Sequence, residues 1–276
     1  MHSFSTWVKS LVWRLVSWLR TVPFVAPILE RLFALALRPF EGRVISIPSG
    51  EAEGLSFRLG RASNVWASGR VEGHVQSALR DIVRPGDTFF DVGANVGFFT
   101  ILGARLVGPT GSVVAFEPQP ETREALLGNV ALNGFSNVVV DPRAISNSSG
   151  TAVLDWRNLP TARLVRDSQH GTGRSVSVPT TSIDDFLAEY PSLAPRVVKI
   201  DVEGHEIAVL QGMRRTLADH APVLLCEMHR TNRELASELA AVGYRMRVLE
   251  KDVPVEHAPW WAHLIAFPPE GLESAP

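Results

Sequence analysis

The chain is poor in the features that mark secreted, membrane-spanning and nucleic-acid-binding proteins. Cys226 is its only cysteine, which excludes a disulfide framework and a zinc site built from cysteines. The formal net charge of -2 gives no bulk attraction to nucleic acid, and no nucleic-acid-binding motif is present. Charges, Pro23 and Pro27 interrupt the apolar runs near the N-terminus before about 18 residues, the length that a transmembrane helix needs. We therefore expect a cytoplasmic protein that does not bind nucleic acid.

The residues that are present have the composition of a globular protein. Of the 276 residues, 45% are hydrophobic and 20% are charged, which indicates a sizeable core. This length accommodates one large domain with a short appendage, and no internal repeat is visible. We predict an N-terminal extension over residues 1–40 and a single domain over residues 41–276.

The extension has the pattern of an amphipathic helix. Residues 4–20 contain Lys9, Arg14 and Arg20 but no acid. Small polar residues and arginine recur every three or four positions, and tryptophan, leucine and valine cover the remaining circumference. Such a helix can lie on an anionic membrane surface, or it can pack on the domain or on a second copy of the chain. Peripheral membrane contact and homo-oligomerisation both stay open, whereas Arg14 and Arg20 argue against a cleaved signal peptide.

A strand, a glycine turn and a helix follow one another in Asp87–Thr100, which reads D-T-F-F-D-V-G-A-N-V-G-F-F-T. The apolar strand carries Asp91 near its end, breaks at Gly93, and is followed by a helix that opens at Gly97. This arrangement binds anionic or nucleoside-bearing ligands at the helix N-terminus. The glycine spacing is G-x-x-x-G, with Asn95 at the position where the dinucleotide pattern G-x-G-x-x-G requires glycine.

Strands alternate with helices along the rest of the chain, which predicts an α/β fold with a mostly parallel sheet. Apolar and β-branched runs predict strands, and spacings of three or four residues between apolar side chains predict helices. We predict strands over residues 44–47, 55–59, 88–92, 112–116, 137–140, 151–156, 175–178, 197–200, 223–226, 244–249 and 263–267. We predict helices over residues 71–83, from 97, and over 121–132, 181–188, 206–217 and 233–242.

Acidic residues stand at the ends of four predicted strands: Asp91, Glu117, Asp201 and Glu227. Ligands of open α/β sheets bind beyond these carboxyl ends. Glu117 follows the glycine turn by roughly twenty residues, the spacing at which an acid accepts the ribose hydroxyls of a nucleoside cofactor. NAD and S-adenosylmethionine both present such a ribose. An acid with one wide turn suits the cationic amine of S-adenosylmethionine better than a pyrophosphate, so the turn favours that cofactor.

Four sequence blocks together resemble the FkbM-type family of S-adenosylmethionine-dependent methyltransferases. They are V-G-A-N-V-G-F-F-T, then F-E-P-Q-P with L-L-G-N-V-A-L-N, then V-K-I-D-V-E-G-H-E with V-L-Q-G, and C-E-M-H. The likeness covers about residues 66–249 in unbroken order. It implies the class I methyltransferase (Rossmann-like) fold, a seven-stranded mostly parallel sheet with helices on both faces and a final antiparallel strand. It also implies S-adenosyl-L-methionine as cofactor, with the methyl group usually passing to a hydroxyl oxygen.

The resemblance also implies a set of cofactor-binding residues. The glycine turn would line the methionine end, the end of the second strand would hold the ribose, and the segment Asp141 to Ala144 would flank the adenine. The segment S-G-R-V-E-G-H resembles the family's S-G-x-x-E segment and places its glutamate near the cofactor or the substrate entrance. The implied residues are Glu72, Asp91, Gly93, Ala94, Asn95, Gly97, Glu117, Pro118 and Ala144.

Methyl transfer to an alcohol needs a group that removes the hydroxyl proton. His229 and Asp201 are the candidates for this base, with Glu227 orienting His229 or the substrate. Histidine has the better intrinsic pKa for the task. Lys199 precedes Asp201 in a buried strand, where it needs an acidic partner, and we expect Glu203 or Glu227.

One further acid and a candidate metal site lie at this end of the sheet. Glu206 stands at a helix start, where the helix dipole alone explains an acid. Asp201, Glu227 and His229 offer oxygen and nitrogen ligands that suit Mg²⁺ or Mn²⁺. Their spacing matches no fixed ligand pattern, so we predict no bound metal.

The sequence therefore predicts a methyltransferase that acts on a hydroxyl of a sugar, glycolipid or secondary metabolite. The polar segment from Asn158 to Arg174 either contributes to the substrate side or is a solvated loop. Two alternatives stay open: a nicotinamide-dependent oxidoreductase of the Rossmann type, and a non-catalytic membrane-surface protein that acts through its N-terminal helix.

Overall fold

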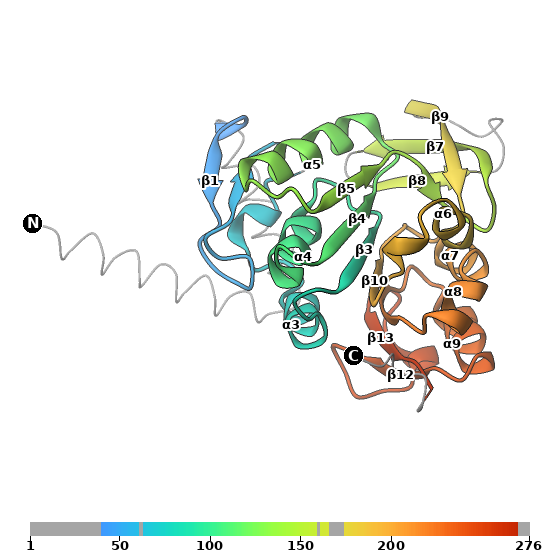
Figure 1. The fold of residues 1–276 in the computed structure, drawn as a ribbon. Coiled ribbons are helices and arrows are strands. Elements are labelled where there is room, and N and C mark those ends of the chain that lie inside the picture. The colour runs from blue at the N-terminus through green and yellow to red at the C-terminus, as the bar shows by residue number, and fades with distance from the viewer. Residues whose placement is uncertain (1–39, 61–62, 159–160, 166–173, 270–276) are drawn as a thin grey trace, which may run out of the picture.

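The computed structural model describes residues 40–60, 63–158, 161–165 and 174–269 (Figure 1). The predicted N-terminal helix therefore lies almost entirely outside the described residues. Within those residues, no helix has the length and apolar character needed to cross a membrane.

A seven-stranded sheet forms the centre of the fold and has the order β12-β13-β11-β10-β3-β4-β5. Neighbouring strands are parallel except for β13, which is antiparallel to both β11 and β12. The predicted mostly parallel sheet with one late antiparallel strand is confirmed. The strands are β3 (Thr88–Val92), β4 (Ser112–Phe116), β5 (Val138–Asp141), β10 (Val197–Ile200), β11 (Val223–Glu227), β12 (Arg245–Val248) and β13 (His263–Phe267).

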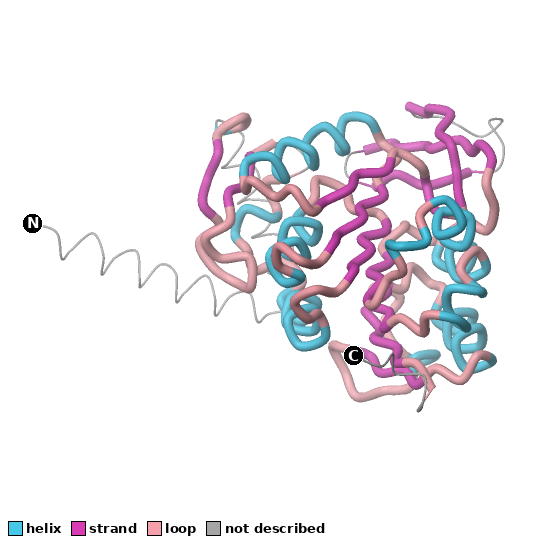
Figure 2. Tube along the Cα trace, in the orientation of Figure 1, coloured by secondary structure: helices cyan, strands magenta, loops and turns pink. Residues whose placement is uncertain are grey.

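Helices cover both faces of this sheet (Figure 2). Successive residues of a strand point to opposite faces, so Phe89 packs in the core beneath α3, α4 and α5 while Phe90 packs in the core beneath α6 to α9. The apolar runs of the central strands are thereby buried on both sides, as parallel sheets require. The helices are α3 (Gly73–Ile82), α4 (Phe98–Val107), α5 (Pro120–Leu132), α6 (Ile183–Glu189), α7 (Glu206–Gln211), α8 (Arg214–Asp219) and α9 (Asn232–Ala241).

The helix predicted over residues 206–217 is two helices, α7 and α8, which break at Gly212. A Cβ at Gly212 would lie 2.1 Å from the carbonyl oxygen of Ser146, so this position admits only glycine. The carboxylate of Asp184 then caps α8 by accepting hydrogen bonds from the backbone amides of Arg215 and Thr216. A tertiary contact therefore overrides the helical periodicity of the segment.

A four-stranded sheet, ordered β6-β9-β7-β8, stands beside the central one. Its strands are β6 (Ala144–Ile145), β7 (Gly150–Asn158), β8 (Thr161–Val165) and β9 (Arg174–Thr181). The predicted loop from Asn158 to Arg174 is wrong in part, because β8 pairs with β7 to form a hairpin. Residues 159–160 and 166–173 of that segment lie outside the described residues.

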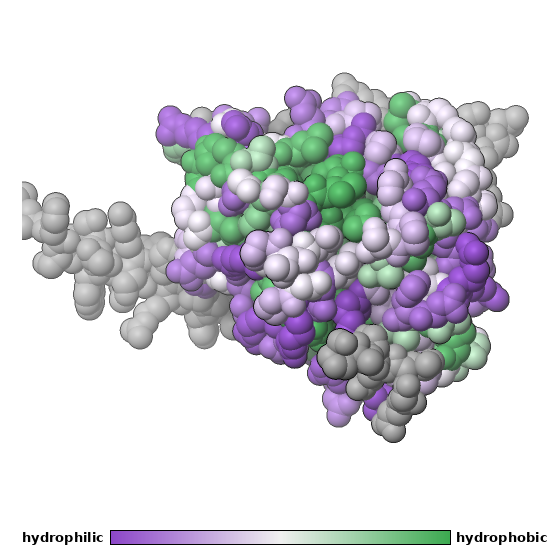
Figure 3. Space-filling model, viewed as in Figure 1, coloured by the Kyte–Doolittle hydropathy of each residue, from purple (hydrophilic) through white to green (hydrophobic). Residues whose placement is uncertain are grey.

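Two smaller features complete the fold. The strands predicted over residues 44–47 and 55–59 are confirmed as β1 (Val44–Ser46) and β2 (Ser56–Arg58), which pair in antiparallel fashion. The side chains of Asn129 in α5 and of Asn133 at its end accept hydrogen bonds from the backbone of β2. Figure 3 shows apolar surface over α5 and β5, in keeping with the exposed side chains of Leu127 and Val139. Short 3-10 helices are η2 (Trp66–Ser68), η4 (Pro191–Leu193) and η5 (Val255–His257).

Candidate active site

The glycine turn after β3 is built around three residues in left-handed conformations. Gly93, Asn95 and Gly97 have φ angles of 81°, 51° and 85°. A Cβ at Gly93 would lie 1.9 Å from the carbonyl oxygen of Asp201, because the end of β10 packs directly on the turn. Asparagine tolerates the left-handed region better than most residues. The turn therefore has its wide shape because of these residue types.

A first pocket, of about 670 Å³, opens between this turn, the end of β4 and β6. Five of the implied cofactor residues line it, namely Gly93, Asn95, Glu117, Pro118 and Ala144. Its lining of apolar side chains with a few converging polar groups is that of a small-molecule site. Asp201 and Glu203 also line it, and the sequence had suggested other roles for them. The remaining lining residues were not singled out: Val92, Phe116, Gln119, Thr122, Ile145, Leu154 and Val202.

Glu117 is buried in the wall of the first pocket and accepts three hydrogen bonds. Its Oε2 accepts from the Asn95 amide at 2.7 Å, and its Oε1 accepts from the Gln119 amide at 2.8 Å and from Thr122 Oγ1 at 3.3 Å. Burial raises the pKa of Glu117 to about 7, against the lowering effect of these hydrogen bonds. A carboxylate offers about four acceptor positions, so Oε2 can accept one further donor.

Unpartnered polar atoms in the first pocket fit an amino-acid nucleoside. Asn95 Oδ1 and Gln119 Nε2 are buried and have no hydrogen-bond partner among the described residues. Leaving such atoms unpaired is costly, so they are suited to the polar groups of a bound ligand. Together they offer an acceptor and a donor beside the carboxylate of Glu117.

The other implied cofactor residues, Glu72, Asp91, Ala94 and Gly97, are not in the lining of the first pocket. Asp91 is fully buried, and its Oδ2 accepts a 2.6 Å hydrogen bond from Thr100. Gly97 instead packs against α5, where a Cβ would lie 2.8 Å from a side-chain carbon of Leu126.

Lys199 pairs with acids other than those expected from the sequence. Its Nζ lies 3.3 Å from Asp201 Oδ2 and 3.9 Å from Asp91 Oδ1, and it sits over the ring of Phe99. Parallel pairing places Lys199 opposite Asp91 on the neighbouring strand, which explains the contact. Burial lowers the pKa of Lys199, but the charges of Asp201 and Asp91 outweigh it and raise the pKa above its usual value.

His229 follows β11 and lies among carboxylates. Its Nε2 is 3.5 Å from Glu203 Oε2, 3.6 Å from Glu227 Oε1 and 4.0 Å from Asp201 Oδ1. Burial lowers the pKa of His229, but the hydrogen bond to Glu206 and the charge of Glu227 outweigh it and raise the pKa to about 9. With these neighbours the imidazole carries a proton at neutral pH, and it has to release that proton before it can accept another.

The residue that orients His229 is Glu206 rather than Glu227. Glu206 is fully buried, and its Oε1 forms a 2.8 Å hydrogen bond with His229 Nδ1. Its carboxylate also accepts from the Gly204 amide at 2.8 Å and from Thr231 Oγ1 at 3.1 Å. The helix dipole alone therefore does not account for Glu206, because the side chain fixes the ring of a candidate base.

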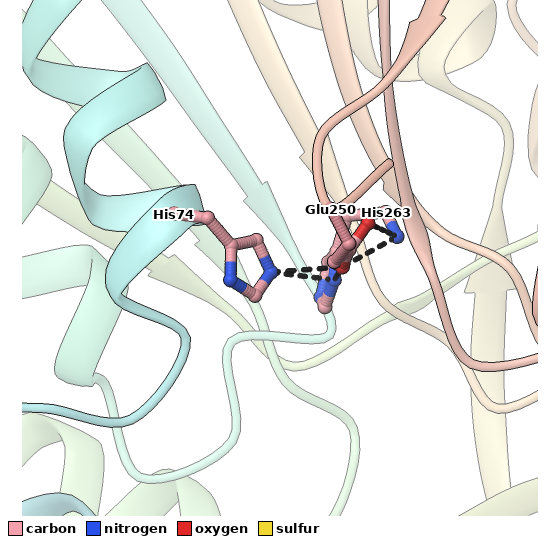
Figure 4. A group of neighbouring side chains, drawn as sticks. All are labelled: His74, Glu250 and His263. Atoms are coloured by element: carbon pink, nitrogen blue, oxygen red, sulfur yellow. Dashed lines mark hydrogen bonds and ion pairs between the residues drawn. The ribbon is translucent and has the colours of Figure 1, made fainter. Parts of the chain in front are cut away.

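A second histidine, His263, is buried at the same edge and was not singled out in the sequence. Its Nδ1 lies 2.7 Å from Glu250 Oε1 and 3.0 Å from His74 Nε2 (Figure 4). Antiparallel pairing sets His263 directly opposite Glu227. The sequence signal was weak, since His263 is only the first residue of the last strand and Glu250 follows β12.

A second pocket, of about 570 Å³, lies on the other side of Glu203. It is lined by Glu203, His229, Arg230 and Trp260. The guanidinium of Arg230 stacks over the Trp260 ring, with its Cζ 5.3 Å from the ring centroid. Since Glu203 also lines the first pocket, the two pockets meet at one side chain next to His229.

Comparison with known proteins settles which family this fold and site belong to. Residues 91–246, more than half of the chain, match the model of the FkbM methyltransferase domain. The chain belongs to the FkbM methyltransferase family. The resemblance of the four sequence blocks is thereby confirmed, and the chain is an S-adenosylmethionine-dependent methyltransferase with S-adenosylmethionine as its cofactor. The nicotinamide-dependent and non-catalytic alternatives are not supported.

Curated methyltransferases are similar to this chain over part of their length. The chain is 31% identical over 148 residues to the hexuronic acid methyltransferase AglP of Haloferax volcanii, covering 54% of this chain and 59% of that protein. It is 27% identical over 205 residues to the 31-O-demethyl-FK506 methyltransferase FkbM of Streptomyces tacrolimicus, covering 63% of this chain and 77% of that protein.

Solved structures of methyltransferases are also similar. A methyltransferase FkbM from Methylobacillus flagellatus has a TM-score of 0.47 at 16% identity and covers 76% of this chain and 55% of its own. An S-adenosylmethionine-dependent O-methyltransferase from Thermotoga maritima has a TM-score of 0.48 at 17% identity and covers 83% of this chain and 78% of its own.

Proposed function

We propose that this FkbM family member is an O-methyltransferase whose acceptor is a hydroxyl group of a sugar, glycolipid or secondary metabolite. The observation that carries this proposal is the meeting of the two pockets at Glu203 beside His229. A pocket lined by the glycine turn and Glu117 on one side and a partly aromatic pocket on the other suit a cofactor and an acceptor that approach each other there.

The lining of the second pocket favours a glycosyl acceptor within that class. The Trp260 side chain is 53% exposed, so its ring can stack on the apolar face of a sugar. Arg230 beside it can hold hydroxyl or carboxylate oxygens. The similarity to a protein named as a hexuronic acid methyltransferase agrees with this preference.

The first pocket is proposed to hold S-adenosylmethionine, which supplies an activated methyl group on a sulfonium sulfur. Gly93 and Asn95 give the backbone its close, wide turn around the amino-acid end. Glu117 would accept a ribose hydroxyl at the remaining acceptor position of Oε2, and Ala144 would border the adenine. Asp91 lies in β3 beneath the turn and is proposed to contribute through its Oδ1, which has no hydrogen-bond partner among the described residues.

The acceptor's proton is proposed to pass to His229, with Asp201 as the other candidate. His229 lines the second pocket, and the hydrogen bond that its Nδ1 donates to Glu206 fixes the ring with Nε2 facing Asp201 and Glu227. An alcohol keeps its proton at neutral pH unless a base stands within hydrogen-bond reach. Because its carboxylate neighbours favour the protonated ring, His229 first has to release a proton; the same carboxylates then stabilise the imidazolium that forms again when the ring accepts the proton of the acceptor.

The test is transfer of an isotopically labelled methyl group from S-adenosylmethionine to a panel of free sugars, uronic acids and glycosides. We expect a new ether methyl on at least one glycosyl acceptor, located by NMR, and no transfer to the same acceptor with its hydroxyl blocked. A labelled product methylated on nitrogen or carbon would overturn the assignment to oxygen. Product formation only with non-glycosyl alcohols would overturn the preference for sugars.

A further inference from the structure

The carboxylates of Glu72 and Glu227 and the imidazole of His263 converge at the carboxyl edge of the sheet. They meet at Oε2 of Glu227, whereas His229 faces its Oε1. His263 Nε2 lies 3.5 Å from Glu72 Oε2 and 3.7 Å from Glu227 Oε2. These separations are too long for well-formed hydrogen bonds. Glu72 Oε2 and His263 Nε2 are both buried without a hydrogen-bond partner among the described residues. Two polar atoms are thus left unsatisfied while facing each other.

His263 is held in the way that metal-binding histidines are held. It is only 6% exposed, and both its backbone amide and its Nδ1 contact the carboxylate of Glu250. A carboxylate at one ring nitrogen fixes the ring and leaves the other nitrogen to a metal ion. Here the other nitrogen points between Glu72 and Glu227.

The two separations from His263 Nε2 are close to those in a coordination shell, and all three candidate ligand atoms lie within 4.8 Å of one another. With bonds of about 2.0–2.1 Å in tetrahedral geometry, neighbouring ligand atoms lie about 3.3 Å apart. The observed 3.5 and 3.7 Å need movements of only a few tenths of an ångström. Three protein ligands also leave a position for water, as in many zinc sites.

The elements that carry these residues come from distant parts of the chain. Glu72 precedes α3, Glu227 ends β11 and His263 begins β13. The set differs from Asp201, Glu227 and His229, in which Asp201 is already engaged by Lys199 at 3.3 Å.

We propose that Glu72, Glu227 and His263 bind a divalent transition-metal cation, Zn²⁺ or Mn²⁺, with Glu250 orienting the histidine. Mixed imidazole and carboxylate ligands suit these ions better than Ca²⁺, which takes oxygen ligands alone. The test of this site is independent of methyl transfer, because it measures cation binding and not activity. Failure of the proposed function would leave it untouched.

The experiment uses the full chain, freed of any affinity tag and stripped with a chelator. Calorimetric titration with Zn²⁺ and with Mn²⁺ is expected to give one bound cation per chain, and elemental analysis after gel filtration is expected to confirm it. Glu72→Gln and His263→Gln should each weaken binding at least about tenfold, and Glu250→Gln by about 10- to 100-fold. Glu256→Gln and His257→Gln, at exposed positions of η5, are the matched controls and should bind like wild type.

Circular dichroism checks that each variant is folded. If His263→Gln does not fold, Glu72→Gln decides, because its side chain is 18% exposed at a helix start. Wild-type protein that binds no cation, or binds it as tightly after Glu72→Gln, would overturn the proposal. The three side chains would then be an ion-pair cluster around a protonated His263.

Discussion

The carboxyl edge of the sheet has two halves that are built differently. At β3 and β4, the first pocket is formed by a turn, backbone amides and one buried acid, Glu117. At β10, β11 and β13, carboxylates surround His229 and His263 at separations of 2.7 to 4.0 Å. In the first half, residues from a short stretch of chain determine the shape of the pocket. In the second half, residues that are distant in the sequence determine the charge around the two histidines. We expect substitutions in the first half to change cofactor binding and substitutions in the second to change turnover.

The largest expected effect is the loss of turnover, without loss of cofactor affinity, in His229→Ala. Loss of a general base lowers kcat by about 10²–10⁴-fold, while affinity for S-adenosylhomocysteine stays that of wild type. Steady-state kinetics and calorimetry on the same preparation measure both. His257→Ala, an exposed histidine in η5, is the control and should leave kcat unchanged. An unchanged kcat in His229→Ala would move the base to Asp201.

Gly93→Ala tests the turn that shapes the first half. An alanine there combines a positive φ of 81° with a Cβ placed 1.9 Å from the Asp201 carbonyl oxygen. Gly134→Ala is the matched control, because its φ is 67° and nothing lies within 4 Å of the added Cβ. We expect the control to lose about 1–2 kcal/mol of unfolding free energy in urea, and Gly93→Ala to lose more than twice as much. Equal losses would show that the close packing of β10 on the turn is not needed.

The raised pKa of Glu117 leads us to expect that cofactor affinity depends on pH. With its pKa near 7, the side chain binds a proton more tightly than an unfolded glutamate does. Its stabilising effect on the fold is therefore complete below about pH 4.5 and is lost as the pH rises to about 7. A ribose hydroxyl that donates to Oε2 favours the ionised form, so the affinity for S-adenosylhomocysteine should rise about tenfold from pH 6 to pH 8. Glu117→Gln should show the same weak affinity at both values, and a steep rise in that variant would point to another group.

The smallest effect is expected in the second pocket. Trp260→Ala should raise the KM for a glycosyl acceptor about fivefold, corresponding to about 1 kcal/mol of lost stacking, without changing cofactor affinity. Trp261→Ala is the matched control, because Trp261 is 45% exposed but does not line the pocket. Equal KM values for the two variants would remove Trp260 from the acceptor side.

Sequence reasoning located the first half well because its signals are local. The strand Thr88–Val92, the turn at Gly93 and the acid at Glu117 follow from residue types within one short stretch, and the strand bounds are confirmed. The number of strands in the central sheet and its antiparallel last strand followed from the family resemblance, whereas the strand order did not. The predicted helix over residues 1–40, with its membrane or oligomer contact, stays a prediction because residues 1–39 lie outside the described chain.

The second half was predicted less well because its contacts are long-range. The partner of Lys199 depends on the register between β10 and β3, which no local pattern gives. The contact from Glu206 to His229 joins a helix start to a strand end, and His263 meets Glu227 only through the antiparallel pairing of β13. Charge clusters of this kind become visible once the strand order is known.

The most direct measurement of the division between the two halves is one calorimetric titration series with S-adenosylhomocysteine, run on wild type, Glu117→Ala and His229→Ala. We predict saturable binding of one molecule per chain to wild type and to His229→Ala with equal affinity. Glu117→Ala should bind about 5- to 150-fold more weakly, corresponding to about 1–3 kcal/mol for an unpaired ribose hydroxyl. Wild-type affinity in Glu117→Ala, or weakened binding in His229→Ala alone, would contradict the placement of the cofactor at β3 and β4.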